Sequence, residues 1–297
     1  MDGISKNLLW HYCSEKTFGL ILTNKTIRLS DVTKCLDKQE LKYAKRKFAS
    51  LLNNDISPII DTFPKNSREF SEALSAKIIV SKLSSSKICW VFCISESDEV
   101  ERHWFVHGDR GKGLSIGFSL EPLINNVSKI KLLPVKIVYG KKEVIRLYEK
   151  KKARLRKVID RSHDKYVEIS KMSIATEQKR ENKLNRLTHE CYSKIFDLLL
   201  ADFASFKRHR FEWEKEWRLI LTSTNLKRSL LAKNIRLTLQ DGFRDTWDIS
   251  FNLTSAIKAI TIGKESRLTV DKVHNFLEKE CSLTSEEIKN ITIKKLC

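Results

Sequence analysis

The chain has 297 residues, of which 41% are hydrophobic, and a formal net charge of +19 at pH 7. This length suits one large domain or a domain with a sizeable insertion, and the apolar content can fill a core. No apolar run approaches the roughly 18 residues of a membrane span, and the start lacks the order of a signal peptide, so we expect a cytoplasmic protein outside the membrane. The basic charge favours an acidic partner such as nucleic acid.

The N-terminal third alternates between short strands and helices. Strands are predicted at residues 9–14, 26–31 and 88–95, and helices at 15–24, 37–54 and 67–83. The first strand carries His11 between two aromatic residues. A lone histidine in an apolar strand is more often a hydrogen-bonded core residue than a catalytic one, so its role depends on what surrounds it.

Seven cysteines are scattered through apolar segments without a C-x-x-C pair, so we expect reduced thiols that are mostly in the core. Cys89, Cys93, His103 and His107 have a spacing that loosely resembles a zinc finger. A strand over 88–95 would separate the two sulfurs by about 13 Å, too far for one ion with bonds of about 2.3 Å. We therefore expect no metal site.

Glycines are concentrated in one segment near the middle of the chain. Four of the nine fall in GDRGKGLSIG, residues 108–117. This segment lacks the spacing of a phosphate-binding loop and runs into alternating apolar residues, so we expect a tight connection into a strand over 113–120. Another strand is predicted at 132–140.

A long charged stretch without glycine follows. Its apolar residues step by 4 and 7, which indicates a helix: Val144, Tyr148, Leu155, Ile159 and Tyr166. One helix over 141–210 would be about 105 Å long, so we expect a break at 175–183. The second helix is expected to bury Leu184, Leu187, Cys191, Ile195, Leu198 and Leu199.

This helical pair is also basic. Residues 141–186 hold 16 Lys and Arg against 7 Asp and Glu, a net of +9. Such a surface is either a solvated helix face or a surface for nucleic acid or another partner, and the sequence leaves both open.

The segment FEWEKEWRLI, residues 211–220, crowds like charges. A strand would place Glu212, Glu214, Glu216 and Arg218 on one face, with Glu214 and Glu216 about 6.6 Å apart. Two such charges repel by roughly 2.5 kcal/mol at an effective dielectric of about 20, which raises the pKa of one carboxyl unless a cation such as Arg218 compensates. The alternative is an exposed, salt-bridged strand end.

The remaining elements complete a mixed α+β fold. Strands are predicted at 217–223, 256–263 and 290–295, and a helix at 270–281. Strands interrupted by helices, without a repeated βαβ order, predict a split or curved sheet with helices packed around it.

The segments resemble, in order, those of a bacterial domain family of unknown function. The matching segments are LWHY (9–12), IRLS (27–30), CLDKQE (35–40), CIS (93–95), WFVHGDRGKGLSIGF (104–118), LLPVKIVYG (132–140), FEWEKEWRLI (211–220) and IKAITIG (257–263). Two departures are His107, where the family has tyrosine, and CLDKQE, which keeps only Asp37 and Glu40 of the acidic segment. The resemblance implies a core formed by residues 1–140 and 211–297, with the basic helical pair 141–210 inserted.

That family in turn resembles, more distantly, the ADP-ribosyltransferase fold, in which a split sheet holds NAD in a cleft. The resemblance implies NAD as co-substrate, Glu216 as the group that stabilises the ribosyl cation, and Glu214 as the residue that activates the acceptor. It implies NAD-binding roles for His11, Tyr12, Ser95, Trp104, His107 and Arg218.

The expected function is therefore an NAD-consuming enzyme of the ADP-ribosyltransferase or NAD glycohydrolase type, acting on a macromolecular acceptor such as nucleic acid. Bacterial proteins of this kind often serve as toxins or antiviral effectors, so an inhibitory or complex-forming protein partner is also expected. The alternative is a non-catalytic nucleic-acid-binding or assembly module, in which the basic helices of residues 141–186 bind and the sheet is a scaffold.

Overall fold

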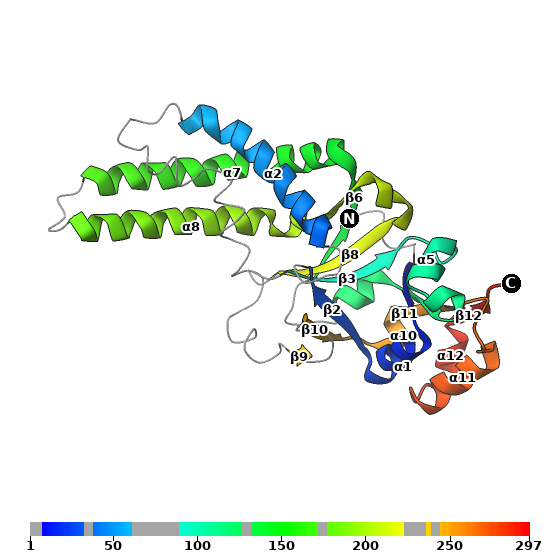
Figure 1. Cartoon of the computed structure of the whole chain (residues 1–297). Helices are drawn as coiled ribbons and strands as arrows, with labels where there is room; N and C mark the ends of the chain where they lie inside the picture. Colours follow the sequence, from blue (N-terminus) through cyan, green and yellow to red (C-terminus); the bar gives the residue numbers. More distant parts are fainter. Residues whose placement is uncertain are drawn as a thin grey trace.

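The computed structural model describes residues 8–32, 38–60, 89–125, 132–171, 177–222, 236–238 and 244–297. They form an α+β fold, as predicted, in which helices pack on both faces of a mixed sheet (Figure 1). No helix in these ranges is both long and apolar enough to cross a membrane.

The first half of the chain contributes most of the sheet. Its elements are β1 (Leu9–Cys13), α1 (Glu15–Asn24), β2 (Thr26–Asp31), α2 (Lys38–Ile60), β3 (Cys89–Ser95), α5 (Glu101–Val106), the 3-10 helix η4 (Asp109–Gly111), β4 (Leu114–Phe118), α6 (Leu120–Asn125), β5 (Leu133–Lys136) and β6 (Val138–Tyr139).

The second half begins with two long helices and returns to the sheet. Its elements are α7 (Gly140–Lys171), α8 (Glu177–Phe203), β7 (Phe206–Lys207), the 3-10 helix η5 (His209–Glu214), β8 (Glu216–Thr222), β9 (Arg236–Thr238), β10 (Arg244–Ser250), α10 (Leu253–Ala256), β11 (Ile257–Ile262), α11 (Val270–Lys279), α12 (Ser285–Lys289) and β12 (Thr292–Lys295).

The sheet is split at β3. β8 pairs with β3 along its whole length, from Cys89 to Ser95, and so occupies one edge of that strand. β1 and β2 share the other edge: β1 meets it at Ser95, and β2 meets it at Trp90 and Val91. β1 then continues to β4, β11 and β12, whereas β2 continues to β10 and β9. The predicted split sheet is therefore present, with its two arms diverging from β3.

Two neighbouring strands, β3 and β8, each contribute side chains to two cores. In β8, Leu219 and Leu221 lie in the core that contains α1 and α11, whereas Ile220 lies in the core that contains α2, α7 and α8. β3 alternates in the same way. Because successive side chains of a strand point to opposite faces, this period-2 pattern means that both faces of the sheet are covered by helices.

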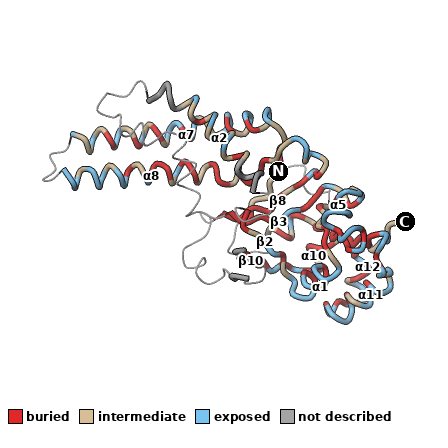
Figure 2. The backbone as a smooth tube through the Cα atoms, in the orientation of Figure 1, coloured by how far each residue is buried: buried red, intermediate tan, exposed pale blue. Residues whose placement is uncertain are grey.

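The two long helices form a hairpin that lies beside α2 (Figure 1). All five apolar positions predicted to face the core from the first helix are buried, and buried residues recur along both helices between exposed ones (Figure 2). In α8, Leu187, Cys191, Ile195 and Leu199 are buried, and Leu184 and Leu198 pack against them. α7 ends at Lys171 and α8 begins at Glu177, so the predicted break is wrong over 177–183, which are helical, and its residues 175–176 lie outside the described part of the chain.

Some sequence predictions were incomplete or wrong. The strand predicted across 211–218 is wrong in its first half, because His209–Glu214 is a 3-10 helix and the strand begins at Glu216. The short helix α5 and the strand β10 were not predicted. The helix predicted at 67–83 and Asp37 lie outside the described residues.

Candidate functional site

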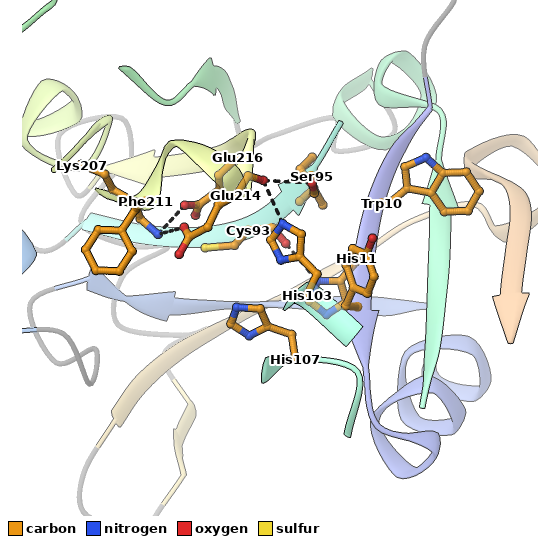
Figure 3. Close-up of a pocket in the computed structure, with 12 residues that line it drawn as sticks. Trp10, His11, Cys93, Ser95, His103, His107, Lys207, Phe211, Glu214 and Glu216 are labelled. Carbon is orange, nitrogen blue, oxygen red and sulfur yellow. Dashed lines mark hydrogen bonds and ion pairs between the residues drawn. The ribbon is translucent and has the colours of Figure 1, made fainter. Parts of the chain in front are cut away.

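A cavity of about 270 Å³ lies beside the point where β1 leaves β3. It is lined by Trp10, His11, Tyr12, Cys93, Ile94, Ser95, His103, His107, Lys207, Phe211, Glu214 and Glu216 (Figure 3). Six of the eight predicted site residues are in this set. The other two, Trp104 and Arg218, lie behind it and support residues that line it.

A lysine joins the two predicted catalytic carboxylates. Lys207 Nζ lies 2.5 Å from Glu214 Oε2 and 2.6 Å from Glu216 Oε2 (Figure 3). All three side chains are almost withdrawn from solvent, with exposed fractions of 11% or less. Both carboxylates therefore approach one point in the cavity, and that point favours positive charge.

Glu216 is held from behind by Arg218. Arg218 Nε donates to Glu216 Oε1 at 2.8 Å, and Arg218 Nη1 donates to the Ala204 carbonyl at 2.7 Å. The Tyr139 hydroxyl accepts a hydrogen bond from the Glu216 backbone N–H at 2.9 Å. These contacts fix both the side chain and the backbone of Glu216, so its carboxylate is pre-positioned at the cavity with Oε2 paired to Lys207.

The two carboxyls differ in pKa. Burial raises the pKa of Glu214, and Lys207 only partly offsets this effect. Burial would also raise the pKa of Glu216, but Arg218 and Lys207 together hold it well below its ordinary value. Glu216 is therefore a permanent anion at neutral pH, whereas Glu214 is the more easily protonated partner. Such a divergence is typical of carboxyl pairs with separate acid–base and electrostatic roles.

The segment from Lys207 to Glu216 reaches the cavity through a sharp turn. β7 pairs with β6, which places Lys207 beside Tyr139, and η5 follows. Lys215 then adopts left-handed backbone angles, with φ 41° and ψ 45°, and its N–H donates to the Glu212 carbonyl. This turn aims Glu214 and Glu216 at the same point from a helix and a strand.

Two side chains anchor this turn through the Glu214 backbone carbonyl. It accepts from Ser95 Oγ at 3.0 Å and from His103 Nε2 at 2.9 Å. Ser95 was predicted to bind NAD, but its hydroxyl donates to the Glu214 carbonyl and so positions the turn between Glu214 and Glu216. His103 Nδ1 is buried and has no hydrogen-bond partner among the described residues.

His11 is a neutral hydrogen-bonding group at the cavity wall. Its Nδ1 lies 2.9 Å from the Cys93 carbonyl, and because a carbonyl only accepts, Nδ1 carries the proton. Burial is the main cause that lowers the His11 pKa, to about 4, despite the opposing hydrogen bond. At neutral pH, Nε2 therefore remains an acceptor, and no described residue donates to it.

Aromatic side chains pack together at another part of the cavity wall. Tyr12 stacks on His103 with ring centroids 4.9 Å apart, and its hydroxyl donates to the Ser97 carbonyl at 2.7 Å. Trp104 meets the Tyr12 ring edge-on at 5.0 Å, and its indole N–H donates to the Asp98 carbonyl. Trp104, predicted to bind NAD, instead supports a residue that lines the cavity. Burial lowers the pKa of His107, which lines the cavity as a neutral ring.

Three of the four residues with the zinc-like spacing, Cys93, His103 and His107, line the cavity, whereas Cys89 lies apart from them. Cys93 is accessible from the cavity, yet the surrounding protein and the charge of Glu216 raise its thiol pKa well above the ordinary value. Cys89 is buried in the core at the other end of β3. Within the part of the chain that the structure describes, no group of three or more His, Cys, Asp or Glu side chains could hold a metal ion.

Sequence reasoning missed Lys207, Trp10 and Phe211, and it weighed His103 only as a zinc ligand. Lys207 is one of 56 lysines and arginines, and its neighbours are equally basic, so composition gave no signal. Its role arises from the pairing of β6 with β7. Trp10 and Phe211 lie inside the quoted motifs, and that position was the available signal, whereas His103 lies one residue before the segment that begins at Trp104.

Comparison with known proteins gives one match. Residues 103–219 match the model of a family described as "Protein of unknown function (DUF2971)". This region includes the glycine-rich segment, the helical pair and FEWEKEWRL, whereas the LWHY and IKAITIG segments lie outside it. No curated protein and no solved structure matches the chain. Over residues 103–219, the chain is thus similar to a domain family of unknown function, as its motifs predict.

Proposed function

We propose that this cavity binds NAD and breaks the bond between nicotinamide and ribose, on a split sheet of the ADP-ribosyltransferase type. The observation that carries the proposal is that His11 and Glu216, far apart in the sequence, line one cavity. The divergent pKa values of Glu214 and Glu216 add support, because the reaction needs one permanent anion and one proton acceptor.

The cavity suits one end of NAD. Its volume of about 270 Å³ is near the lower end of small-molecule pockets, roughly 300–1,000 Å³, so it would hold the nicotinamide riboside end while the rest of the dinucleotide lies outside. The aromatic rings of Trp10, Tyr12 and Phe211 suit a flat cationic ring such as nicotinamide in NAD. The carboxylates add attraction for its positive charge.

The proposed reaction begins when the bond between ribose C1′ and the nicotinamide nitrogen breaks. The electron pair leaves with nicotinamide, which becomes neutral, and positive charge develops on the ribose. Glu216 stabilises this charge because it is ionised and already fixed by Arg218. A hydroxyl of the acceptor, or water, then attacks C1′, and its proton passes to the Glu214 carboxylate.

His11 would orient the ribose. Its Nε2 accepts hydrogen bonds and stays neutral down to a pH of about 4. It can therefore accept a hydrogen bond from a ribose hydroxyl without adding positive charge beside the developing cation. A protonated histidine at this position would oppose the reaction.

Lys207 has to release Glu216 before that carboxylate can meet the ribose. The ammonium occupies the point at which both carboxylates favour positive charge. Lysine has a flexible four-carbon stem and a single point charge, so its head group can move while its backbone stays fixed in β7. Substrate binding would then exchange one cation for another.

Release of nicotinamide tests the proposal. The purified chain is incubated with NAD, and free nicotinamide is measured for wild type, Glu216→Gln and Glu212→Gln. Glu212 is an exposed carboxylate four residues earlier, so its variant is a matched control. We expect Glu216→Gln to lose at least about 100-fold in rate, as for removal of one transition-state stabiliser, and Glu212→Gln to stay within about twofold. No release by wild type, with or without nucleic acid and protein acceptors, would overturn the proposal.

The competing function is a non-catalytic nucleic-acid-binding module, favoured by the basic surface of α7. In that case, both wild type and Glu216→Gln would bind nucleic acid, and both would release equally little nicotinamide. A toxin or antiviral role, with a protein partner that restrains it, is part of the proposal only if activity is found. Toxicity on expression that is lost in Glu216→Gln would then support it.

A further inference from the structure

The outward face of α7 carries a row of basic side chains. Exposed residues recur along it at steps of four, four, three, four and four: Arg146, Lys150, Arg154, Lys157, Arg161 and Lys165, hereafter the α7 stripe. These steps follow the helical repeat, so the six side chains share one side of the helix. The opposite side is buried against α8 and α2.

Most charges of the α7 stripe are uncompensated. Arg146 pairs with Glu143, but the other five have no carboxylate within ion-pair distance among the described residues. No acidic residue occurs between Glu149 and Asp160. The basic residues of α7 that do form ion pairs with other helices lie beside the stripe: Lys151 with Asp202 and Lys152 with Asp55. A solvated helix face usually interleaves both signs, but the stripe from Lys150 to Lys157 carries only positive charge; the exposed Asp164 and Glu168 lie on the same side only toward the end of α7.

We propose that the α7 stripe binds the phosphate backbone of double-stranded nucleic acid, without reading its sequence. The stripe runs about 28 Å at 1.5 Å per residue, and a duplex offers a regular row of phosphates over that length. α7 has no Asn or Gln for reading adenine. This inference rests on the proposed function where it names the acceptor, although binding itself requires no reaction with NAD.

Two other polyanions fit the surface less well. Single-stranded nucleic acid is bound largely by stacking on exposed aromatic rings, but both tyrosines of α7 are buried and the helix has no Phe or Trp. An anionic membrane is usually bound by a helix whose apolar side enters the lipid. The apolar side of α7 is already covered by protein.

The stripe begins close to the cavity. α7 starts at Gly140, directly after Tyr139, whose hydroxyl accepts a hydrogen bond from the Glu216 backbone. Arg146 is about 10 Å along the helix from Tyr139 at 1.5 Å per residue. A duplex held on the stripe would therefore have one end near the carboxylates, where a nucleotide hydroxyl or base nitrogen could serve as acceptor.

The test is salt-dependent binding of a 25-base-pair DNA or RNA duplex by the full chain, without NAD. The triple variant Lys150→Glu, Arg154→Glu and Lys157→Glu is compared with wild type. We expect at least about tenfold weaker binding near 0.1 M salt, and a slope of log affinity against log salt that is shallower by about 2 to 3, because each lost phosphate contact removes about 0.9. Duplexes of unrelated sequence should bind equally.

The matched control reverses Lys264, Lys279 and Lys289, which are exposed, have no ion pairs among the described residues and lie away from α7. It has the same net charge as the stripe variant and should bind within about twofold of wild type. The proposal would be overturned if both variants lost duplex binding equally, or if the stripe variant lost none. It would also be overturned if the full chain bound vesicles of anionic lipid but not the duplex. Nicotinamide release without duplex should be unchanged in the stripe variant, so failure of binding and failure of the NAD reaction are separate results.

Discussion

At the scale of single residues, the candidate site is a carboxylate pair that shares one lysine but is not symmetric. Glu216 has a second cation, Arg218, whereas Glu214 has only Lys207. The folded protein therefore stabilises the charge of Glu216 and disfavours the charge of Glu214. This difference has a measurable consequence for stability, independent of any reaction.

The first prediction is that Glu216→Gln and Glu214→Gln have opposite pH dependence. The folded pKa of Glu216 lies below its ordinary 4.5, so its charge stabilises the fold above that pH and this stability is lost as pH falls. Glu216→Gln should lower the free energy of unfolding by about 3 kcal/mol at pH 7 and by less below pH 4.5. The folded pKa of Glu214 is raised, so wild type loses stability as pH rises above 4.5, and Glu214→Gln should be spared this loss.

Urea unfolding of both variants and of Glu212→Gln, from pH 7 down to about pH 3, measures these slopes, because the Glu216 contribution falls only below its ordinary pKa. Glu212→Gln controls for loss of an exposed carboxyl. If the two buried positions gave slopes of the same sign, the asymmetric pairing would be wrong.

The second prediction concerns Lys207→Met. Without the ammonium, two buried carboxylates face each other. We therefore expect the free energy of unfolding to fall by about 2 to 4 kcal/mol at pH 7. This loss of stability should shrink as pH falls, because Glu214, whose pKa burial raises, protonates first and relieves the repulsion. Lys207→Arg keeps the charge and should retain most of the stability. If the stability lost in Lys207→Met did not change with pH, the loss would come from packing of the side chain and not from repulsion between the carboxylates.

At the scale of elements, the long periodic segments were predictable from the sequence and the turns were not. α7 and α8 repeat their buried positions over many turns, so the pattern is strong even though packing against α2 was unknown. The buried strand β3 stands out as an apolar run in the same way. By contrast, alternation in FEWEKEW mimics a strand, and only tertiary contacts to the Glu214 carbonyl select a 3-10 helix there.

The candidate site was predicted only where a motif carried it. His11, Glu214 and Glu216 line one cavity, because strands β1 and β8 both flank β3. Lys207 could not be predicted, because pairing with Tyr139 of β6 brings it into place. The two long helices α7 and α8 separate these residues in the sequence. Short-range patterns do not encode such long-range pairing.

The third prediction tests the turn at Lys215. Its left-handed backbone is unfavourable for a β-branched residue, so Lys215→Val should cost about 1 to 2 kcal/mol, while Lys215→Gly should be neutral or slightly stabilising. Ser282, also left-handed with φ 56° but outside the cavity lining, provides the control Ser282→Val. Similar stability loss is expected in both valine variants, measured by urea unfolding. Nicotinamide release should fall only for Lys215→Val, and equal loss in both would contradict a positioning role.

At the scale of the whole molecule, strands β3 and β8 of the sheet separate two hydrophobic cores. The core with α1, α11 and α12 contains Trp90 and Trp247, whereas the core on the other face consists largely of α2, α7 and α8. β3 and β8 supply alternate side chains to both. The helical hairpin is thus attached through the same strands that hold Glu216 and His11 in place.

The fourth prediction is that the two cores unfold together, because they share β3 and β8. Ile195→Ala truncates a side chain in the core of α2, α7 and α8, and Leu277→Ala truncates one in the other core; both side chains are fully buried. Each truncation should cost about 2 to 5 kcal/mol. Because β3 and β8 cannot lose one face without exposing the other, each variant should shift helix circular dichroism and tryptophan fluorescence to the same lower midpoint. If Ile195→Ala shifted only the helical signal, the hairpin would be an independently folding unit, and the basic α7 stripe could be separated from the cavity without harm to it.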